Sequence, residues 1–178
     1  MALEGKRIAV LVEDLYEDLE LWYPVIRMRE ERATVTLIGT GGSQTYHGKH
    51  GLPVSVSTSA DKVSSSDFDA LVILGGYAPD RLRRHESVLK LVRGFQEQNK
   101  PIAAICHAGW VLVSAGIVRG KRLTSYSSIK DDMANAGARW EDSEVVVDGN
   151  LITSRNPEDL AVFTAIIRAL SPVAAGKR

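Results

Sequence analysis

Short apolar runs alternate along the chain with stretches in which apolar residues recur at helical spacing. The runs are rich in β-branched residues and predict buried strands at residues 8–12, 34–38, 70–74 and 102–105. The stretches between them predict helices, among them residues 17–31 and a helix around 88–95. Strands and helices that alternate in this way form βαβ units and a mostly parallel sheet covered by helices on both faces. The pattern therefore predicts an α/β fold.

The predicted helix at residues 17–31 has an apolar face formed by Leu19, Trp22, Tyr23 and Ile26. Pro24 lies inside it, which predicts a kink or a late helix start, because proline lacks the backbone N–H that an interior helical position uses.

Smaller features fill the remaining intervals. Residues 39–60 are rich in Gly, Ser and Thr and predict a small hairpin or an excursion of the chain. Asp148-Gly149-Asn150 predicts a hairpin between residues 145–147 and 151–153. Ser128 and Asp131 have the spacing of a capping box, which predicts a helix that ends at Gly137. Asn156 followed by Pro157 predicts the start of a last helix.

Length and composition agree with a globular domain. The chain has 178 residues, of which 44% are apolar and 25% charged, so a single domain over residues 1–178 can bury a sizeable core. Lys and Arg number 22, and Asp and Glu also number 22, which gives a net charge of zero. This balance argues against a general nucleic-acid binder and against a polybasic membrane module, and we expect neither nucleic acid nor membrane as a partner.

Three features bear on the compartment. Cys106 is the single cysteine of the sequence, so no internal disulfide is possible. The first twelve residues contain the acidic Glu4 and only a five-residue apolar run, which is unlike a signal peptide. Residues 102–118 form the longest nearly apolar stretch, and its 17 residues are too few for a comfortable membrane span. We expect a cytoplasmic protein.

Parallel sheets of this kind bind ligands just beyond the carboxyl ends of their strands. After the first strand, five of the eight residues from Glu13 to Glu20 are carboxylates. They have two interpretations. They can form an acidic helix start, which the helix dipole favours, or one carboxylate can turn inward and share a proton with a neighbouring group.

Two glycines, Gly75 and Gly76, follow the strand at 70–74. Glycine at a strand end permits a positive φ or a close approach of two backbones. The pair therefore fits either a tight turn or a site where a backbone N–H receives a developing oxyanion.

Cys106 and His107 follow the strand at 102–105, where the chain is predicted to turn into a helix. A lone cysteine is commonly a small buried apolar residue. At a strand-to-helix turn, however, the helix N-terminus offers free N–H groups and a partial positive charge, which favour the thiolate. Small residues at 108 and 109 permit the sharp elbow that carries a nucleophile. We therefore predict a nucleophilic Cys106 with a thiol pKa below the usual ~8.5.

Other motifs give weaker signals. His47 and His50 have a metal-like spacing, but the stretch is rich in glycine and no cysteine or carboxylate stands beside them. Gly39, Gly41 and Gly42 follow a strand without completing a dinucleotide-binding fingerprint, and no phosphate-binding loop sequence occurs. We expect neither a metal nor an organic cofactor.

Several linked motifs, spread from about residue 7 to residue 170, resemble one known family. The matching segments are Glu17–Pro24, Gly48–Gly51, Gly75–Asp80, Ala104–His107, Val113–Gly120, Leu123–Tyr126, Asp131–Gly137 and Ser154–Leu160. In these segments the chain resembles the PfpI-type intracellular proteases and protein deglycases of the ThiJ/PfpI superfamily, a group similar to class I glutamine amidotransferases. The family pattern is modified at Asp80, where glutamate is common, and at Ala108-Gly109, where Gly-Pro is common.

The resemblance implies a flavodoxin-like three-layer sandwich and assigns roles to specific residues. Cys106 is the nucleophile, with His107 as its partner and Glu17 as a partly protonated carboxylate that hydrogen-bonds the thiol. The backbone N–H groups of Gly76 and His107 form the oxyanion hole. Asp80 orients the histidine of a neighbouring subunit, which implies a homo-oligomer, at least a dimer, with the site completed across the interface.

The resulting functional hypothesis is a cysteine-dependent hydrolase that acts on carbonyl adducts or reactive aldehydes, in the manner of a deglycase or glyoxalase, and protects against stress. Amide or peptide hydrolysis by the same thiolate is the main alternative, so the partner is a small-molecule or peptide substrate. A second class of hypothesis is a redox-sensing or chaperone-like stress protein, because oxidation of cysteine follows thiolate character and exposure. A nucleotide-binding flavodoxin-like module is a third class of hypothesis, and no motif in the sequence supports it.

Overall fold

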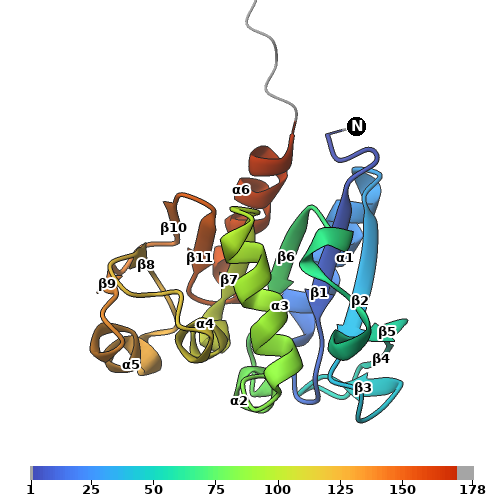
Figure 1. Ribbon diagram of the computed structural model, residues 1–178, viewed down its shortest axis with the longest axis horizontal. Coiled ribbons are helices and arrows are strands. Elements are labelled where there is room, and N and C mark those ends of the chain that lie inside the picture. Colours follow the sequence, from blue (N-terminus) through green and yellow to red (C-terminus); the bar gives the residue numbers. More distant parts are fainter. Residues whose placement is uncertain (1, 172–178) are drawn as a thin grey trace, which may run out of the picture.

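A seven-stranded sheet lies at the centre of the computed structural model, which describes residues 2–171 (Figure 1). Its strands, in spatial order, are β10 (Val145–Asp148), β11 (Leu151–Ser154), β7 (Ile102–Ile105), β6 (Ala70–Ile73), β1 (Arg7–Leu11), β2 (Thr34–Gly39) and β5 (Thr58–Ser59). Neighbours pair in parallel except for the antiparallel hairpin β10–β11. Two two-stranded sheets stand outside it, namely β3 (Thr45–His47) with β4 (Pro53–Ser55), and β8 (Arg122–Leu123) with β9 (Arg139–Trp140).

Helices cover both faces of the sheet, so the fold is the predicted flavodoxin-like α/β sandwich. One face carries α1 (Asp18–Glu30) and α6 (Ala161–Leu170), and the other carries α2 (Ala78–Leu82), α3 (Glu86–Glu97) and α4 (Gly109–Ala115) (Figure 1). The short helix α5 (Lys130–Asn135) lies beside α4. Every residue of β6 and β7 is buried, because apolar runs in the middle of such a sheet are covered from both sides.

Most predicted elements are confirmed within one or two residues. The hairpin predicted within residues 39–60 is β3–β4, and the turn Asp148-Gly149-Asn150 joins β10 to β11. The Asn156 side chain accepts the Glu158 N–H at 3.0 Å, as an N-cap does, although a 3₁₀ turn at Pro157–Asp159 precedes α6. Residues 1 and 172–178 of the predicted domain lie outside the described residues.

The orientation of α1 differs from what its apolar pattern suggests. Leu19 and Ile26 are each 59% exposed and Tyr23 is 40% exposed, so this side of the helix faces outward. The side that packs on the sheet consists of Glu20, Leu21, Pro24, Val25 and Met28. Apolar residues occur on both sides of α1, and the pattern alone therefore did not identify the buried one. The helix begins at Asp18 and continues through Pro24.

The predicted capping box at Ser128 and Asp131 is wrong. Residues Ser127–Ile129 form a 3₁₀ turn, and α5 begins after Ile129 without a hydrogen bond from a capping side chain. The Ser128 hydroxyl lies instead beside the ring of His107.

Within residues 2–171, the structure contains no helix with the length and apolar character needed to cross a bilayer.

Candidate active site

The carboxyl ends of β1, β6 and β7 meet at one edge of the sheet, and a cavity of about 470 Å³ opens there. Its lining residues are Glu17, Lys49, Gly76, Tyr77, Cys106, His107, Tyr126 and Pro157. They come from loops far apart in the sequence. The site predicted from the ends of the strands is therefore a single pocket, and Cys106 stands in its wall.

Cys106 occupies a sharp elbow between β7 and α4. Its φ is +63°, in the left-handed region of the backbone that residues other than glycine rarely adopt. A 3₁₀ turn over Cys106–Ala108 leads from the strand into the helix. Strained backbone of this kind persists where the surrounding structure enforces it, as at nucleophile elbows. Ala108, by contrast, has a φ of −56° and carries no such strain. The cysteine is 8% exposed, so its thiol is nearly buried but borders the cavity.

His107 reaches back to the sulfur although it is the next residue in the chain. Its Nδ1 lies 3.2 Å from Cys106 Sγ, and its Nε2 lies 3.1 Å from Ser128 Oγ. The ring stacks on Tyr126 at 4.9 Å and meets the edge of Trp110 at 5.2 Å. Burial lowers the pKa of His107, and the positive charge of Lys49 lowers it further, so the imidazole is held in its neutral form.

The glycine pair after β6 makes the close approach possible. A Cβ atom on Gly75 would stand 2.5 Å from Cβ of Cys106, and one on Gly76 would stand 2.4 Å from the Leu15 carbonyl oxygen. Gly76 also has a φ of +73°. Its N–H and the N–H of His107 hydrogen-bond the cysteine side chain and lower the pKa of the thiol. The two N–H groups predicted for the oxyanion hole thus converge on the sulfur.

The carboxyl group beside the thiol belongs to Glu20, whereas the resemblance assigned this contact to Glu17. Glu20 is fully buried, and its Oε2 accepts the Gly75 N–H at 2.6 Å. Oε2 and Cys106 Sγ both lie within 3.0 Å of the position that a Cβ atom on Gly75 would take. Glu20 lies one turn into α1 on its buried side, which directs the carboxyl group at the elbow. The general interpretation that one carboxylate turns inward is therefore right, but the residue is a different one.

Glu17 stands at the N-cap of α1 and lines the mouth of the cavity. Its carboxylate forms a short ion pair with Lys49, and its Oε1 lies 3.8 Å from Nε2 of His50. Among the described contacts, the thiol is not a hydrogen-bond partner of Glu17. The Lys49 side chain, which is 35% exposed, thereby places a positive charge beside Glu17 and close enough to Cys106 and His107 to affect their pKa values.

Glu20 and Cys106 titrate as a coupled pair. Burial raises the pKa of the Glu20 carboxyl to about 8, and the hydrogen bond from Gly75 lowers it by less. Burial also raises the pKa of the Cys106 thiol to about 12, with the negative charge of Glu20 as the second cause. The predicted lowering of the thiol pKa is therefore wrong for a thiol beside an ionised Glu20. When Glu20 keeps its proton, this repulsion is absent, so a thiolate requires that the shared proton stay on the carboxyl.

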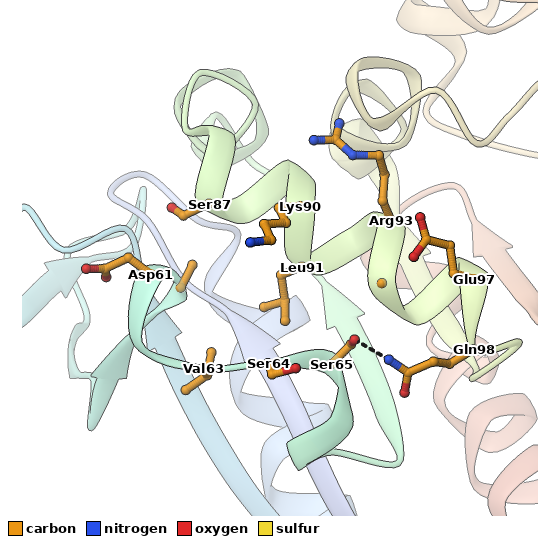
Figure 2. A pocket seen from close by; sticks show the side chains of 12 residues that line it. Asp61, Val63, Ser64, Ser65, Ser87, Lys90, Leu91, Arg93, Glu97 and Gln98 are labelled. Atoms are coloured by element: carbon orange, nitrogen blue, oxygen red, sulfur yellow. Dashed lines mark hydrogen bonds between the residues drawn. The ribbon is translucent and has the colours of Figure 1, made fainter.

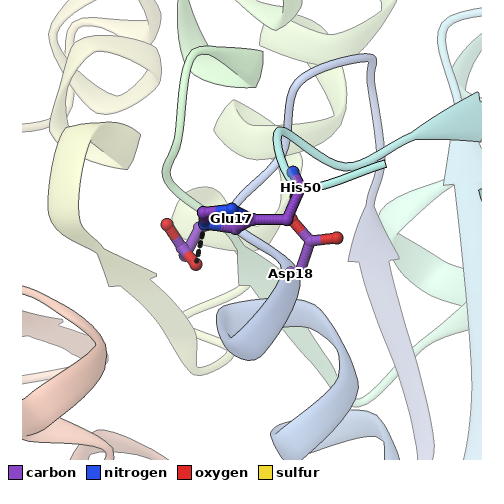
Figure 3. Close-up of side chains that lie close together, drawn as sticks. All are labelled: Glu17, Asp18 and His50. Atoms are coloured by element: carbon purple, nitrogen blue, oxygen red, sulfur yellow. Dashed lines mark hydrogen bonds and ion pairs between the residues drawn. The ribbon is translucent and has the colours of Figure 1, made fainter. Parts of the chain in front are cut away.

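Glu17, Asp18 and His50 present potential metal-ligand atoms within 4.8 Å of one another (Figure 3). Both carboxylates are already engaged by the protein. Glu17 pairs with Lys49, and Asp18 accepts the backbone N–H groups of His50 and Leu52 at 3.0 and 3.3 Å. The cluster is explained by these contacts, which tie the loop of residues 48–52 to the start of α1.

A larger cavity, of about 570 Å³, lies elsewhere (Figure 2). It is formed between the turns at residues 60–65 and one side of α3, and Figure 2 shows Ser65 hydrogen-bonded to Gln98 within it. Its lining includes Lys90, Arg93 and Glu97 but neither cysteine nor histidine. Of these two cavities, the smaller one is therefore the candidate active site, because a cysteine and a histidine line it.

Asp80 lies in the first turn of α2 and is exposed. It does not line the cavity at Cys106 of its own chain. Its predicted contact with the histidine of a neighbouring subunit stays a prediction.

Sequence reasoning missed three residues of the site. Glu20 was hidden among five carboxylates, and the spacing of Leu21, Val25 and Met28 on the same side of the helix was the available signal. Lys49 lines the pocket and Ser128 contacts His107, both from loops whose positions depend on tertiary contacts. Lys49 lies in the matching segment Gly48–Gly51, but no role was assigned to its side chain.

Comparisons with known proteins identify relatives of this chain. The model of the DJ-1/PfpI family matches residues 6–169. A deglycase of Pyrococcus horikoshii is 47% identical over 154 residues, which are 86% of this chain and 92% of that protein. The protein/nucleic acid deglycase 2 of Escherichia coli is 41% identical over 161 residues, 89% of this chain and 94% of that protein.

Among solved structures, a two-domain protein of Anabaena variabilis with DJ-1/ThiJ/PfpI-like and ferritin-like domains superimposes with a TM-score of 0.91 at 38% identity. The superposition covers 98% of this chain and 52% of that protein, so this chain spans about half of its length.

Proposed function

The chain belongs to the DJ-1/PfpI family, and on this premise we propose that it is a cysteine-dependent hydrolase of the PfpI type, which acts on carbonyl adducts or reactive aldehydes. The relatives named deglycases support this substrate class. Removal of such adducts, or conversion of the free aldehydes, protects proteins against carbonyl stress. The lone cysteine would stay reduced in the cytoplasm, which is the compartment we propose.

One observation carries the proposal, namely the convergence of an acid–base group and two N–H donors on Cys106 Sγ. Nδ1 of His107 lies 3.2 Å from the sulfur, and the N–H groups of Gly76 and His107 hydrogen-bond it. A carbonyl carbon attacked by the sulfur would place its oxygen near these same donors. Preorganised donors of this kind stabilise the negative charge that develops on the oxygen in the transition state.

The sequence of steps follows from the positions of these groups. The thiolate of Cys106 adds to the electrophilic carbonyl carbon, and the carbonyl oxygen takes up the electron pair in the oxyanion hole. The neutral imidazole of His107 accepts or returns a proton at Nδ1, while Glu20 holds the proton that the thiol gave up. For an acyl adduct or an amide, the tetrahedral intermediate then expels the amine, which takes up the proton that the thiol gave up, and Cys106 is left as a thioester. Water hydrolyses this thioester to a carboxylic acid and the free thiol.

The surroundings of Cys106 disfavour a redox-sensing role. A sensor cysteine is an exposed thiol of low pKa, whereas burial raises the pKa of this thiol and leaves it 8% exposed. A reactant that fits the cavity and meets the oxyanion donors is favoured over a general oxidant.

We propose further that the protein is a homo-oligomer, at least a dimer, that contacts its second copy through the outer side of α1. Leu19 and Ile26 lie seven residues apart on that side and are each 59% exposed. A pair of large apolar side chains on one outward helix face is typical of an interface between subunits. A dimer would also bring in the neighbouring subunit to which the role of Asp80 belongs.

The test is a comparison of the purified protein with its Cys106→Ser variant on three substrates, methylglyoxal, a glycated peptide and a fluorogenic peptide. We expect turnover of methylglyoxal or of the glycated peptide, and its loss in the variant. Turnover of the fluorogenic peptide alone would identify a peptidase. Absence of turnover on all three, together with ready oxidation of Cys106 to sulfinic acid, would support the sensor and overturn the proposal.

A further inference from the structure

The Ser128 hydroxyl contacts the side of the His107 ring that faces away from the sulfur. Its Oγ lies 3.1 Å from Nε2, while Nδ1 lies 3.2 Å from Cys106 Sγ. The capping role that the sequence suggested for this serine is not realised, since α5 begins without a side-chain cap. The hydroxyl is therefore available to the histidine.

The turn that carries Ser128 is fixed to the elbow. The Tyr126 N–H donates to the Cys106 carbonyl oxygen at 3.2 Å, and Ile129 is buried in the core. A Cβ atom on Gly109 would stand 2.9 Å from Sδ of Met133 and 3.2 Å from Cδ1 of Ile129, which shows how closely this turn packs on α4. The turn and the elbow are thus held together by backbone and core contacts that do not involve the side chains of Ser128 and His107.

We propose that Ser128 is a positioning residue, which acts through Nε2 of His107 to set the protonation state that Nδ1 presents to Cys106. The histidine is then oriented within one chain. This inference rests on the proposed function of Cys106 as the nucleophile.

The chemistry follows from the two ring nitrogens of a neutral histidine, of which one donates and the other accepts. When the cysteine is a thiol, Nδ1 accepts a hydrogen bond from the S–H group, and Nε2–H donates a hydrogen bond to Ser128 Oγ. After the thiol gives its proton to the Glu20 carboxylate, Nδ1 must carry the hydrogen in order to donate to the thiolate. Nε2 is then an acceptor, and the serine hydroxyl rotates to donate to it. In both of these states of the cysteine the histidine carries one proton, and exchange with solvent moves it between the ring nitrogens.

A hydroxyl suits this exchange better than a carboxylate, because a carboxylate only accepts and would favour a charged imidazolium. The charged and titratable groups around the ring are Cys106 and Glu20 beyond Nδ1, Lys49 across the cavity, Tyr126 against one face, and Asp132 and Arg83 behind Trp110. The positive charge of Lys49 disfavours protonation of the ring to the imidazolium form. A neutral histidine with a hydroxyl partner is the arrangement that these groups support.

This role is the one that the family resemblance gives to Asp80 of a neighbouring subunit. Both groups would need the same nitrogen, Nε2. The two assignments therefore make opposite predictions for Ser128→Ala and Asp80→Ala.

The experiment measures the rate at which iodoacetamide alkylates Cys106 between pH 5 and pH 10, which needs no substrate. We expect Ser128→Ala to shift the profile to higher pH and to slow the reaction at pH 7 by about fivefold, the size of a single lost hydrogen bond. Ser128→Thr keeps a hydroxyl and should stay within about twofold of the unchanged protein. The neighbouring Ser127→Ala is the matched control, since Ser127 is equally exposed and lies in the same turn.

A second readout is the ¹⁵N spectrum of His107, which reports the hydrogen on each ring nitrogen. When the thiol is ionised, the ring hydrogen of His107 should lie mainly on Nδ1 in the unchanged protein and in Ser128→Thr. Ser128→Ala should lose this preference while its circular dichroism spectrum stays the same. A merely structural serine would leave the ratio of the two tautomers unchanged.

Each outcome is decisive. Unchanged alkylation and tautomer ratio in Ser128→Ala, with both altered in Asp80→Ala, would overturn the inference and leave the proposed function standing. Conversely, absence of turnover on every substrate would overturn the proposed function, whereas the alkylation profile and the ¹⁵N spectrum would still report on Ser128.

Discussion

The Gly75 N–H donates to Oε2 of Glu20 at 2.6 Å, and this bond fixes a fully buried carboxyl group against the elbow of Cys106. The other carboxyl oxygen, Oε1, is buried and has no hydrogen-bond partner among the described residues. A buried carboxylate with so little solvation is costly. The protein thus favours the protonated carboxyl, which is the form that can share its hydrogen with the sulfur.

The pH dependence of stability should reveal this carboxyl group. Burial raises the pKa of Glu20 from 4.5 to about 8 in the folded protein, so the folded state keeps a proton that the unfolded chain has released in this window. The contribution of Glu20 to the free energy of unfolding therefore falls as pH rises from about 4.5 to 8, and this loss levels off above that pH. We expect Glu20→Gln to gain stability relative to the unchanged protein over this window, on the order of 1 kcal/mol per pH unit.

Urea unfolding at pH 5, 6.5 and 8 measures the difference. Glu4→Gln is the matched control, because the Glu4 side chain is 64% exposed. Curves for Glu20→Gln and the unchanged protein that run parallel with pH would show that the carboxyl is solvated in solution.

The closeness of β6 to the elbow should make Gly75 intolerant of any side chain. A methyl group at Gly75 would stand 2.5 Å from Cβ of Cys106 and 2.6 Å from Oε2 of Glu20. Gly75→Ala should therefore cost about 1–3 kcal/mol of stability and abolish turnover, because overpacking displaces the cysteine. Gly42→Ala is the control, since a methyl group there meets nothing within 4 Å, and it should change stability by less than about 0.5 kcal/mol. Full activity of Gly75→Ala would mean that the elbow is more adaptable than its contacts indicate.

The fold was predictable from the sequence because its main signals are local. Apolar runs such as residues 102–105 gave the strands, and Gly116, with a φ of +77°, ends α4 where the pattern stops. The position of Cys106 and the glycine pair before it were also recognisable.

The choice between Glu17 and Glu20 depended on which side of α1 meets the sheet. Because Leu19 and Ile26 are apolar and exposed, hydrophobicity alone pointed to the wrong side.

The charge of Lys49 should control the titration of the groups in the pocket. Lys49 lowers the pKa of His107. It also lowers the pKa of Cys106, although by less than burial raises it. Lys49→Met should therefore raise both pKa values, because both groups lose a nearby positive charge. An NMR titration of His107 and the alkylation profile of Cys106 measure the two shifts. Lys62→Met, at an exposed lysine outside the cavity, is the control and should change neither. A fall in the His107 pKa would contradict the electrostatic role of Lys49.

The exposed side of α1 should determine the oligomeric state. We expect light scattering to give the unchanged protein a mass of at least twice the 19.4 kDa of one chain, because Leu19 and Ile26 would otherwise leave apolar surface in water. Ile26→Asp should shift the mass towards that of one chain, since a carboxylate in an apolar interface loses its hydration without gaining a partner. Val147→Asp is the matched control, because Val147 is 51% exposed but lies on the edge strand β10. A mass near 19.4 kDa for the unchanged protein would exclude any role of Asp80 across an interface, while an unchanged mass in Ile26→Asp would place the contact on another face.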